Sequence, residues 1–554
     1  MKKHPVRRPL LFLIFIFFFS LNAAPVLRIG IFSDTHVTED KNSCILLEKS
    51  LSLFKDKKAD MVINAGDIAD SYHIRAYRNY RETVNKVYQN NKKPQEIFVY
   101  ANHDRLNRRK ESVWQVFKDV KKYLEIPNAP YDVIKFKGYT FVVIPQFADM
   151  ARYKAMLDKA VRENPGKPVF VIDHVPPANT VFATSGLTEE RRKLLDNYPS
   201  VILICGHKHN TLESELAIWQ GNFTVVHAGC LQVWRPYLIG IPWSRVKSTA
   251  VLFLEVYKDK LIFRRYNAVT GKEYKPDTPW TIPLPFDKKT APYNPERRRQ
   301  ASSAPEFAPG AKISVSHDEK YVNFTFPHAR HTDGVYRYKT ELFRREGNKK
   351  VLFARSDRIG NFIAPEKKQT KISFNNGYFQ SGKRYTVRIT PMNFWNKEGK
   401  AIEKNFSVPA QKKYEICFES KNPAADCMVF EGAAGNKRLY PDKDGFFTLP
   451  ENQSLRLIFP GNIWKGKAWT PYRFTVELHL KDTRPVPRFM TLRNPDPIDS
   501  ASGRILLPQG DTGNLRYVFY HSKREDDYNY YLLLLPGSKG KVRFNYIKSE
   551  KLSH

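Results

Sequence analysis

Cysteine is scarce in this chain of 554 residues. The five cysteines are Cys44, Cys205, Cys230, Cys417 and Cys427. So low a count excludes a small scaffold held together by disulfide bonds, and the odd number leaves at least one thiol free or bonded to another chain. A lipoprotein anchor is not expected either, because Cys44 lies well past the apolar N-terminal run.

Long apolar runs are also absent. The run from Leu10 to Phe19 has ten residues, whereas about 20 are needed to cross a bilayer comfortably. Basic residues precede this run and the small residues of Ser20 to Ala24 follow it, which is the pattern of a secretory signal peptide. We assign residues 1–24 to this signal and predict a protein that is secreted or lies in the periplasm or cell envelope. A retained N-terminal anchor is the alternative.

Acidic residues are few relative to basic ones. The chain has 56 Asp and Glu against 91 Lys and Arg, a formal net charge of +35. Such a charge attracts anions, among them nucleotides, phospholipid head groups and anionic polymers. The basic residues are scattered, however, and neither a long basic run nor a specific nucleic-acid motif occurs, which favours a solvated basic surface. Internal repeats of the kind that build solenoids are not evident.

Residues 25–270 have the pattern of an α/β domain. Short apolar runs such as VLRIGIF at 26–32 and MVINAGD at 61–67 indicate buried strands, and residues 44–57 and 73–90 have helical spacing. Alternation of such segments predicts mainly buried β-sheet flanked by helices.

The chain changes character after residue 270. Residues 271–305 are rich in proline and charge and predict a linker. Residues 306–408 alternate in the manner of a β-sandwich, and their end resembles a fibronectin type III domain, with Gly382 and Tyr385 at the tyrosine corner. Residues 411–554 are again β-rich and predict a second all-β sandwich of unknown type.

Seven oxygen or nitrogen donors follow apolar strand-like segments of the α/β region. They are Asp34, His36, Asp67, Asn102, His174, His207 and His209. Such side chains suit divalent transition metals. Because ligands bind beyond the carboxyl ends of strands in open α/β sheets, donors at these places indicate one shared site. The number of donors fits a pair of metal ions with one bridging carboxylate.

In order and spacing, the segments that carry these donors resemble the five signature blocks of the calcineurin-like metallophosphoesterase family. The blocks are Asp34-Thr35-His36, Gly66-Asp67, Asn102-His103-Asp104, His174 and Gly206-His207-Lys208-His209. The resemblance covers about residues 26–270. It implies a four-layer α/β sandwich in which β-sheets are flanked by helices, followed here by the two all-β sandwich domains.

The resemblance also implies roles for single residues. One metal ion would be bound by Asp34, His36 and His209, and the second by Asn102, His174 and His207. Asp67 would bridge the two ions, with manganese, iron or zinc as the expected metals. His103 would assist the leaving group, and Asp70 would orient His103 through a hydrogen bond.

Two positions depart from related patterns. Ala101 stands where the family's block usually has glycine, which is tolerated only if the backbone there does not need a positive φ. Asp70 occupies the position at which purple acid phosphatases need a tyrosine, so a tyrosinate–iron site is not expected.

Three further residues are candidates for substrate binding. Arg105 and Arg109 follow the Asn-His block and could meet a substrate phosphate, although an exposed basic segment would have the same pattern. Trp234 could offer a platform for a base or sugar ring, or pack inside the protein.

The sequence therefore predicts an exported dinuclear metallophosphoesterase. A hydroxide that bridges the metals would attack phosphorus, and His103 would assist departure of the leaving group. The substrate is a phosphate ester: monoesters remain open, and the compact layout, similar to cyclic-nucleotide and glycerophosphodiester enzymes, favours diesters. The β-sandwich domains would bind an anionic surface or polysaccharide. The alternative is an envelope binding or adhesion protein in which the phosphoesterase domain is an inactive relic.

Overall fold

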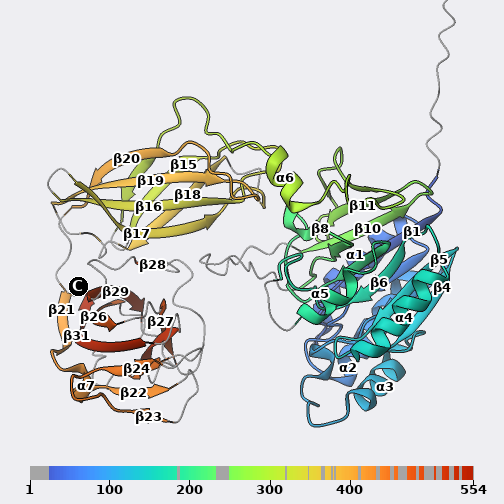
Figure 1. The fold of residues 1–554 in the computed structure, drawn as a ribbon, viewed down its shortest axis with the longest axis horizontal. Helices are drawn as coiled ribbons and strands as arrows, with labels where there is room; N and C mark the ends of the chain where they lie inside the picture. Colours follow the sequence, from blue (N-terminus) through green and yellow to red (C-terminus); the bar gives the residue numbers. More distant parts are fainter. Residues whose placement is uncertain are drawn as a thin grey trace, which may run out of the picture.

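The computed structural model describes residues 24–183, 188–232 and 249–318 and, with gaps, residues 321–552 (Figure 1). All but the last residue of the predicted signal peptide lies outside the described residues, as does Trp234. Within the described ranges, no helix is long and apolar enough to span a membrane. The five cysteines are all buried.

The first sheet of the α/β region is built around three parallel strands. Its order is β12-β11-β10-β1-β2-β3, with β13 also paired to β11. The strands are β1 (Leu27–Phe32), β2 (Met61–Asn64), β3 (Gln95–Phe98), β10 (Ala250–Val256), β11 (Lys260–Asn267), β12 (Glu273–Tyr274) and β13 (Trp280–Pro283). The outer face is covered by α1 (Ile45–Asp56), α2 (Ile74–Tyr88) and α3 (Val113–Leu124), with 3-10 turns η1 (Lys41–Cys44) and η2 (His103–Arg105) nearby.

The second sheet has the order β4-β5-β6-β7-β9-β8, and β5, β6, β7 and β9 are parallel. Its elements are β4 (Asp132–Phe136), β5 (Tyr139–Ile144), β6 (Val169–Asp173), β7 (Val201–Cys205), β8 (Ile218–Gln220) and β9 (Thr224–His227). Helices α4 (Met150–Arg162) and α5 (Glu189–Leu195) pack on its outer face, and η3 (Glu215–Ala217) precedes β8.

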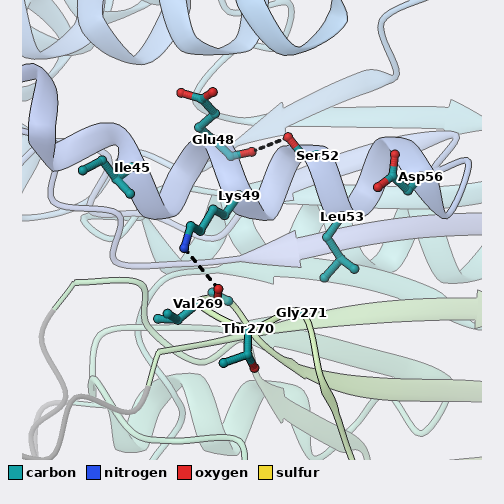
Figure 2. Close-up of a pocket in the computed structure, with 10 residues that line it drawn as sticks. Ile45, Glu48, Lys49, Ser52, Leu53, Asp56, Val269, Thr270 and Gly271 are labelled. Carbon is teal, nitrogen blue, oxygen red and sulfur yellow. Dashed lines mark hydrogen bonds between the residues drawn. The ribbon is translucent and has the colours of Figure 1, made fainter.

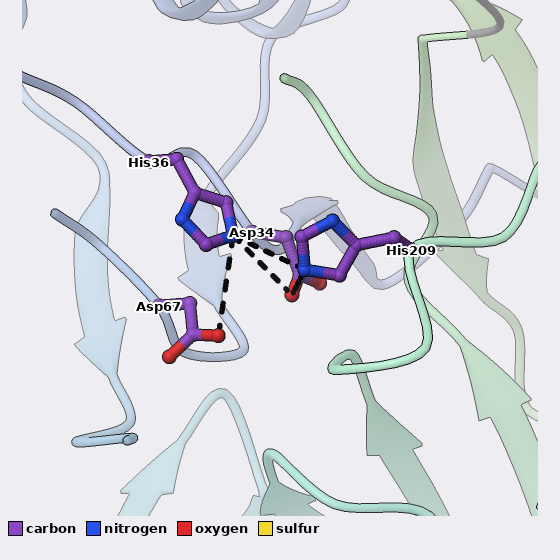
Figure 3. Close-up of side chains that lie close together, drawn as sticks. All are labelled: Asp34, His36, Asp67 and His209. Carbon is purple, nitrogen blue, oxygen red and sulfur yellow. Dashed lines mark hydrogen bonds and ion pairs between the residues drawn. The ribbon is translucent and has the colours of Figure 1, made fainter. Parts of the chain in front are cut away.

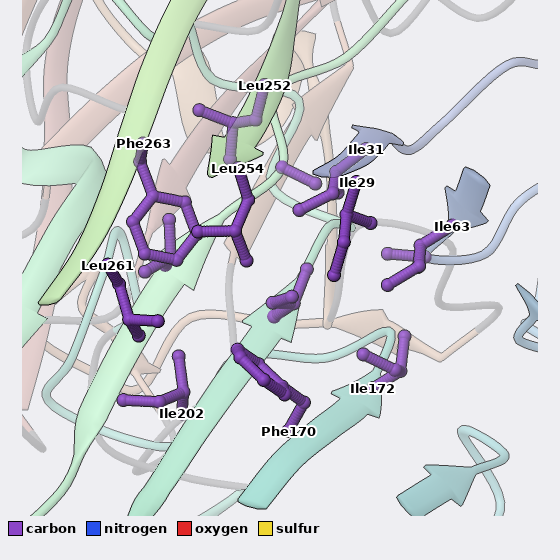
Figure 4. Packing of buried hydrophobic residues seen from close by; sticks show 14 of the residues in the cluster. Ile29, Ile31, Ile63, Phe170, Ile172, Ile202, Leu252, Leu254, Leu261 and Phe263 are labelled. Carbon is purple, nitrogen blue, oxygen red and sulfur yellow. The ribbon is translucent and has the colours of Figure 1, made fainter. Parts of the chain in front are cut away.

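The two sheets face each other across one apolar core (Figure 4). Ile29 and Ile63 of the first sheet and Phe170 and Ile202 of the second are fully buried in it. Burial of each such side chain contributes about 1.5–3 kcal/mol. The layers therefore run helix, sheet, sheet, helix, and the predicted α/β domain is confirmed.

The structure differs from the linker expected at residues 271–305. Strands β12 and β13 extend the first sheet, and Trp280 pairs with Phe263 of β11. Trp280 and Ile282 point into the core and are 1% and 0% exposed. Their burial keeps this proline-rich segment on the sheet. The segment ends with α6 (Pro295–Ala301), whose N-cap is Asn294.

A buried carboxylate ties α6 to the α/β domain. Glu215 Oε1 lies 3.0 Å from Arg265 Nη1 and 2.8 Å from Lys275 Nζ, and Oε2 lies 2.7 Å from Arg298 Nη2 of α6. Trp280 Nε1 also donates to Oε2, at 3.2 Å. Burial by itself raises the pKa of Glu215, but the three cations lower it well below its usual range.

The next two sheets share one core. One has the order β14-β15-β18 and the other β20-β19-β16-β17-β28. Their strands are β14 (Ser314–His317), β15 (Tyr321–Pro327), β16 (Arg337–Glu346), β17 (Lys349–Ile359), β18 (Gln369–Asn375), β19 (Arg384–Met392), β20 (Ile402–Ser407) and β28 (Ile505–Leu506). This region contacts the α/β domain: Leu216 packs against its aromatic cluster, and the Arg298 guanidinium lies 4.3 Å from the Trp395 ring centroid.

The C-terminal region is also rich in β-sheet. Its two sheets have the orders β21-β31-β26-β29, with β24 on β31, and β23-β22-β25-β30-β27. The elements are β21 (Tyr414–Ser420), α7 (Pro423–Asp426), β22 (Met428–Glu431), β23 (Arg438–Leu439), β24 (Phe447–Leu449), β25 (Leu455–Ile458), β26 (Pro471–Lys481), β27 (Val486–Thr491), β29 (Asn514–Ser522), β30 (Tyr530–Leu535) and β31 (Gly540–Leu552).

An open pocket of 480 Å³ lies between α1 and residues 268–271 (Figure 2). Lys49 Nζ donates to the carbonyl of Val269 across it, at 3.2 Å. The pocket is lined by none of the seven predicted metal ligands.

We expect Glu215→Gln to lower the free energy of unfolding by about 3–5 kcal/mol, because it removes the carboxylate that balances three cations. Thermal unfolding followed by calorimetry measures the change. The folded-state pKa of Glu215 lies below the ordinary value of 4.5, so its stabilisation is present above that pH and is lost as the pH falls below it. The difference from the unsubstituted protein should therefore shrink in acid.

Glu296→Gln is the matched control. Glu296 is 54% exposed and pairs with Arg299 on the surface of α6. Loss of such a pair costs at most about 1 kcal/mol. Equal destabilisation by the two substitutions would contradict the central position given to Glu215.

Candidate metal centre

Six of the seven predicted ligands come together where the parallel strands of both sheets end. The seventh, Asn102, directly precedes His103, whose main-chain nitrogen donates to Asp67 Oδ1 at 3.0 Å. Asp34 and His36 follow β1, Asp67 follows β2 and Asn102 follows β3. His174 directly follows β6 of the second sheet, and His207 and His209 follow β7. Because the two sheets face each other, their carboxyl ends bring donors that lie far apart in the sequence, from Asp34 to His209, into one site.

One group of donors centres on Asp34 (Figure 3). His209 Nε2 lies 3.1 Å from Asp34 Oδ1 and 3.2 Å from His36 Nε2. His36 Nε2 is also 3.9 Å from Asp34 Oδ1 and 4.0 Å from Asp67 Oδ2. The donor atoms of Asp34, His36, Asp67 and His209 all lie within 4.8 Å of one another, as a bound cation requires.

Asp67 also belongs to a second group, with His174 and His207. His174 Nε2 lies 3.1 Å from Asp67 Oδ2, and the His174 and His207 rings are 5.1 Å apart. His174 Nδ1 donates to the carbonyl of Ala65 at 2.8 Å, which leaves Nε2 facing the site. Asp67 is the residue that the two donor groups share.

The backbone around the site is strained. Asp34, His36, Asp67, His207 and His209 all have left-handed backbones, with φ of 53°, 41°, 52°, 71° and 46°. Side chains other than glycine adopt this region at a cost of roughly 1–2 kcal/mol, and such residues cluster at functional sites.

Glycine is required at one position and dispensable at another. A Cβ at Gly206 would lie 1.8 Å from Ser33 Oγ and 2.6 Å from Asp34 Oδ2. Ala101, in contrast, is not among the residues with positive φ and is fully buried. The methyl group that departs from the family's pattern is therefore accommodated without backbone strain.

Several donor atoms are buried without a hydrogen-bond partner. Among the described residues, these include Asn102 Oδ1, and also Asp67 Oδ2 and His174 Nε2, which meet each other only as an ion pair at 3.1 Å. Each buried acceptor left unpaired costs about 1–3 kcal/mol. A cation in the second donor group would coordinate Asp67 and His174 together, so the residues present fit the two metal ions that the sequence predicts.

The charges of the site favour cation binding. Burial by itself raises the pKa of Asp34, but His209, His174 and His36 lower it below its usual range. Burial lowers the pKa of His174, but Asp67 and Asp34 raise it to about 9. Burial and His174 lower the pKa of His207 to about 3. The carboxylates are therefore ionised and His207 is neutral, and a cation would displace the proton of His174.

His103 lies at the edge of the site, and Asp70 contacts it differently from expectation. His103 Nδ1 donates to the backbone carbonyl of Asp70 at 2.6 Å, whereas the Asp70 carboxylate is 3.9 Å from that nitrogen. The carboxylate lies closer to His36 Nδ1, at 3.3 Å. The expected hydrogen bond is thus made by the main chain of Asp70, because its side chain turns toward His36.

The arginines expected to bind substrate have contacts within their own loop. Arg105 donates to the carbonyls of Arg109 and Glu111, at 2.6 Å and 2.9 Å, and its guanidinium lies over the Phe147 ring. The Arg109 side chain is exposed. Trp234 lies outside the described residues.

The structure also reveals residues that the sequence did not single out. Asp104 is fully buried and accepts hydrogen bonds from the main-chain nitrogens of Ala69 and Ala101, at 3.2 Å each. It joins the loop of Asp67 to the loop of Asn102. Asp173, next to His174, forms a buried ion pair with Arg191. A charged residue at the end of the buried run VFVID was the one sequence signal for this pair.

Comparison with known proteins places the family within part of the chain. A sequence model of the calcineurin-like phosphoesterase family matches residues 27–211. This segment is a calcineurin-like phosphoesterase domain, and that family uses a dinuclear metal centre. The enzyme class predicted from the sequence, a hydrolase that acts on phosphate esters, is confirmed. No curated protein sequence matches the chain.

Solved structures with a similar arrangement are distant. A predicted phosphoesterase from Streptococcus pneumoniae is 11% identical, with a TM-score of 0.23, over 46% of this chain and 97% of that one. The purple acid phosphatase PPD1 of yellow lupin is 12% identical, with a TM-score of 0.35, over 46% of this chain and 53% of that one. The sulfate thiohydrolase SoxB of Thermus thermophilus is 12% identical, with a TM-score of 0.27, over 55% of this chain and 65% of that one.

We expect Mn²⁺ to raise the melting temperature of the protein, because a ligand that binds only the folded state stabilises it by about 2.7 kcal/mol at a hundred times its dissociation constant. Asp67→Asn should abolish most of this shift, since Asp67 is common to both donor groups. Thermal unfolding with and without Mn²⁺ measures the difference. Asp56→Asn, an exposed change on α1, should keep the full shift. A full shift in Asp67→Asn would contradict the assignment.

Proposed function

We propose that the protein is an exported phosphoesterase with two divalent transition metal ions, manganese, iron or zinc. One observation carries the proposal: Asp67 lies in both groups of buried donors, as a bridging carboxylate must. When bound, two such ions supply Lewis-acid activation of water and positive charge for the phosphate oxygens. Asp34, His36 and His209 would hold the first ion, and Asn102, His174 and His207 would hold the second.

The residues of the chain would supply binding geometry and a proton. His103 Nδ1 donates to the Asp70 carbonyl, which directs the other ring nitrogen, Nε2, away from the main chain. A proton on Nε2 would pass to the leaving oxygen as the ester bond breaks. His103 N donates to Asp67 Oδ1 at 3.0 Å, and this bond fixes the position of His103 relative to the two donor groups.

The proposed substrates are phosphodiesters or phosphomonoesters, and we favour diesters from the resemblance of the compact layout to diesterases. Purified protein loaded with Mn²⁺ should hydrolyse bis(4-nitrophenyl) phosphate faster than 4-nitrophenyl phosphate. The reverse order would assign the site to monoesters. Inactivity on both, with metal bound, would count against the enzyme and favour the binding or adhesion protein.

Export and surface binding complete the proposal. Export is supported by the basic residues and apolar run of residues 1–24. A fibronectin type III-like domain at residues 306–408 is supported by its pair of sheets, β14-β15-β18 facing β20-β19-β16-β17. Together with the C-terminal β-rich region, this domain would hold the enzyme near an anionic surface or polysaccharide.

We expect His103→Ala to slow hydrolysis by about 10²–10⁴-fold, the range for loss of a general acid. The loss should be larger for phenyl phosphate esters than for 4-nitrophenyl esters, because nitrophenolate leaves without a proton. Steady-state rates on the two leaving groups measure this difference. His317→Ala, an exposed change on β14, serves as the control. An equal loss on both leaving groups would exclude proton donation by His103.

A further inference from the structure

A buried ion pair lies directly behind the second group of donors. Asp173 is the last residue of β6 and precedes His174. Its carboxylate is fully buried, and Arg191 Nη1 lies 2.6 Å and 2.7 Å from its two oxygens. Replacing such pairs by apolar residues often leaves stability unchanged or improves it. Stability alone therefore does not explain this pair, and the segments that Arg191 contacts suggest a role in positioning them.

Arg191 also reaches the support of Asn102. Its Nη2 donates a hydrogen bond to the main-chain carbonyl of Gln146. Gln146 in turn is bonded to the segment after β3 that carries Asn102. Its main-chain nitrogen donates to the Tyr100 carbonyl at 3.0 Å, and its side-chain Oε1 accepts from Asn102 N at 2.8 Å. One guanidinium of α5 therefore connects the segment that bears His174 with the segment that supports Asn102.

The first group of donors is held by other contacts. Asp34 accepts hydrogen bonds at 3.2 Å and 3.1 Å from the main-chain nitrogen of His207, whose ring belongs to the second group. The main-chain nitrogens of Asp34 and His36 donate to the carbonyls of Gly66 and Asp67, at 2.9 Å and 3.1 Å. The hydrogen bonds recorded for the Arg191 side chain go to Asp173 and Gln146. Loss of Arg191 should thus disturb the supports of Asn102 and His174 and leave these contacts of Asp34 and His36 in place.

We propose that Arg191 is a positioning residue for one half of the dinuclear site, the half assigned to Asn102 and His174. The inference rests on the function proposed above. The planar fork of arginine is suited to this task, because it grips both carboxylate oxygens of Asp173 with one nitrogen and the Gln146 carbonyl with another. A lysine ammonium can replace the contact to Asp173 but cannot contact Asp173 and the Gln146 carbonyl in the same way at once.

The test is a titration of Mn²⁺ into metal-free protein by calorimetry, with bound metal counted by mass spectrometry. The unsubstituted chain should bind two ions. Arg191→Met should weaken one of the two binding steps by about 10–100-fold, the usual effect of losing a partner behind a metal ligand, and leave the other step unchanged. Arg191→Lys should weaken the same binding step by less than Arg191→Met does.

Arg192→Met is the matched control on the same helix. Arg192 bonds Asp196 at 3.0 Å and the carbonyls of Ala178 and Asn179 at 3.3 Å and 3.4 Å, with none of these contacts directed at Asp173 or Gln146. It should keep both binding steps. A purely structural role for Arg191 would lower the melting temperature and leave both Mn²⁺ affinities intact, and that result would overturn the proposal.

Gln146→Met keeps the test decisive if Arg191→Met does not fold. It removes the acceptor of Asn102 N and preserves the carbonyl that Arg191 contacts. The same single binding step should weaken, and combining Gln146→Met with Arg191→Lys should give less than the sum of the separate effects. Unchanged binding in Gln146→Met would refute the link to Asn102. Failure of the unsubstituted chain to bind any Mn²⁺ would instead refute the proposed function.

Discussion

Two carboxylates, Asp34 and Asp67, lie buried side by side at the meeting point of two β-sheets, 0% and 1% exposed. An ionised carboxylate taken out of water costs several kcal/mol unless opposite charge compensates it. The surrounding histidines provide part of this compensation, and His174 does so at the expense of holding a proton. The loops, strained backbones and glycines of the site all follow from the need to bring enough nitrogen donors around these two acids.

Glu215, another buried acid of the domain, clarifies what is unusual about Asp34 and Asp67. Glu215 is surrounded by Arg265, Lys275 and Arg298, so the chain's own cations neutralise it. At the metal centre, Asn102 Oδ1 is buried without a hydrogen-bond partner among the described residues, and Asp67 Oδ2 is paired only with the His174 ring, at 3.1 Å. The charge of Glu215 is balanced within the protein, and its ion pairs tie α6 to the α/β domain. The donors around Asp34 and Asp67 can instead accept a cation.

Local pattern was enough to predict the α/β domain and the donors of its site. Apolar strand segments followed at once by polar residues predict both the sheets and the edge of the sheets at which ligands bind. The elements β1, α1, β2 and α2 lie where the periodicity of the sequence predicted them. The segment that holds β13 was expected as a linker, because the three residues between Pro279 and Pro283 carry too little periodicity to reveal that Trp280 is buried. The link from Arg191 to Asp173 could not be predicted from spacing, since it depends on how α5 packs on the second sheet. The hydrogen bond that the His103 ring donates to the main-chain carbonyl of Asp70 could not be predicted either, because a sequence pattern concerns side chains.

The central claim is that Asp67 bridges two metal ions. Crystals of the protein grown with Mn²⁺ allow a direct test by anomalous diffraction at the manganese edge. We expect two anomalous peaks about 3.5–4 Å apart, one on each side of the Asp67 carboxylate. A single peak, or peaks away from Asp67, would contradict it.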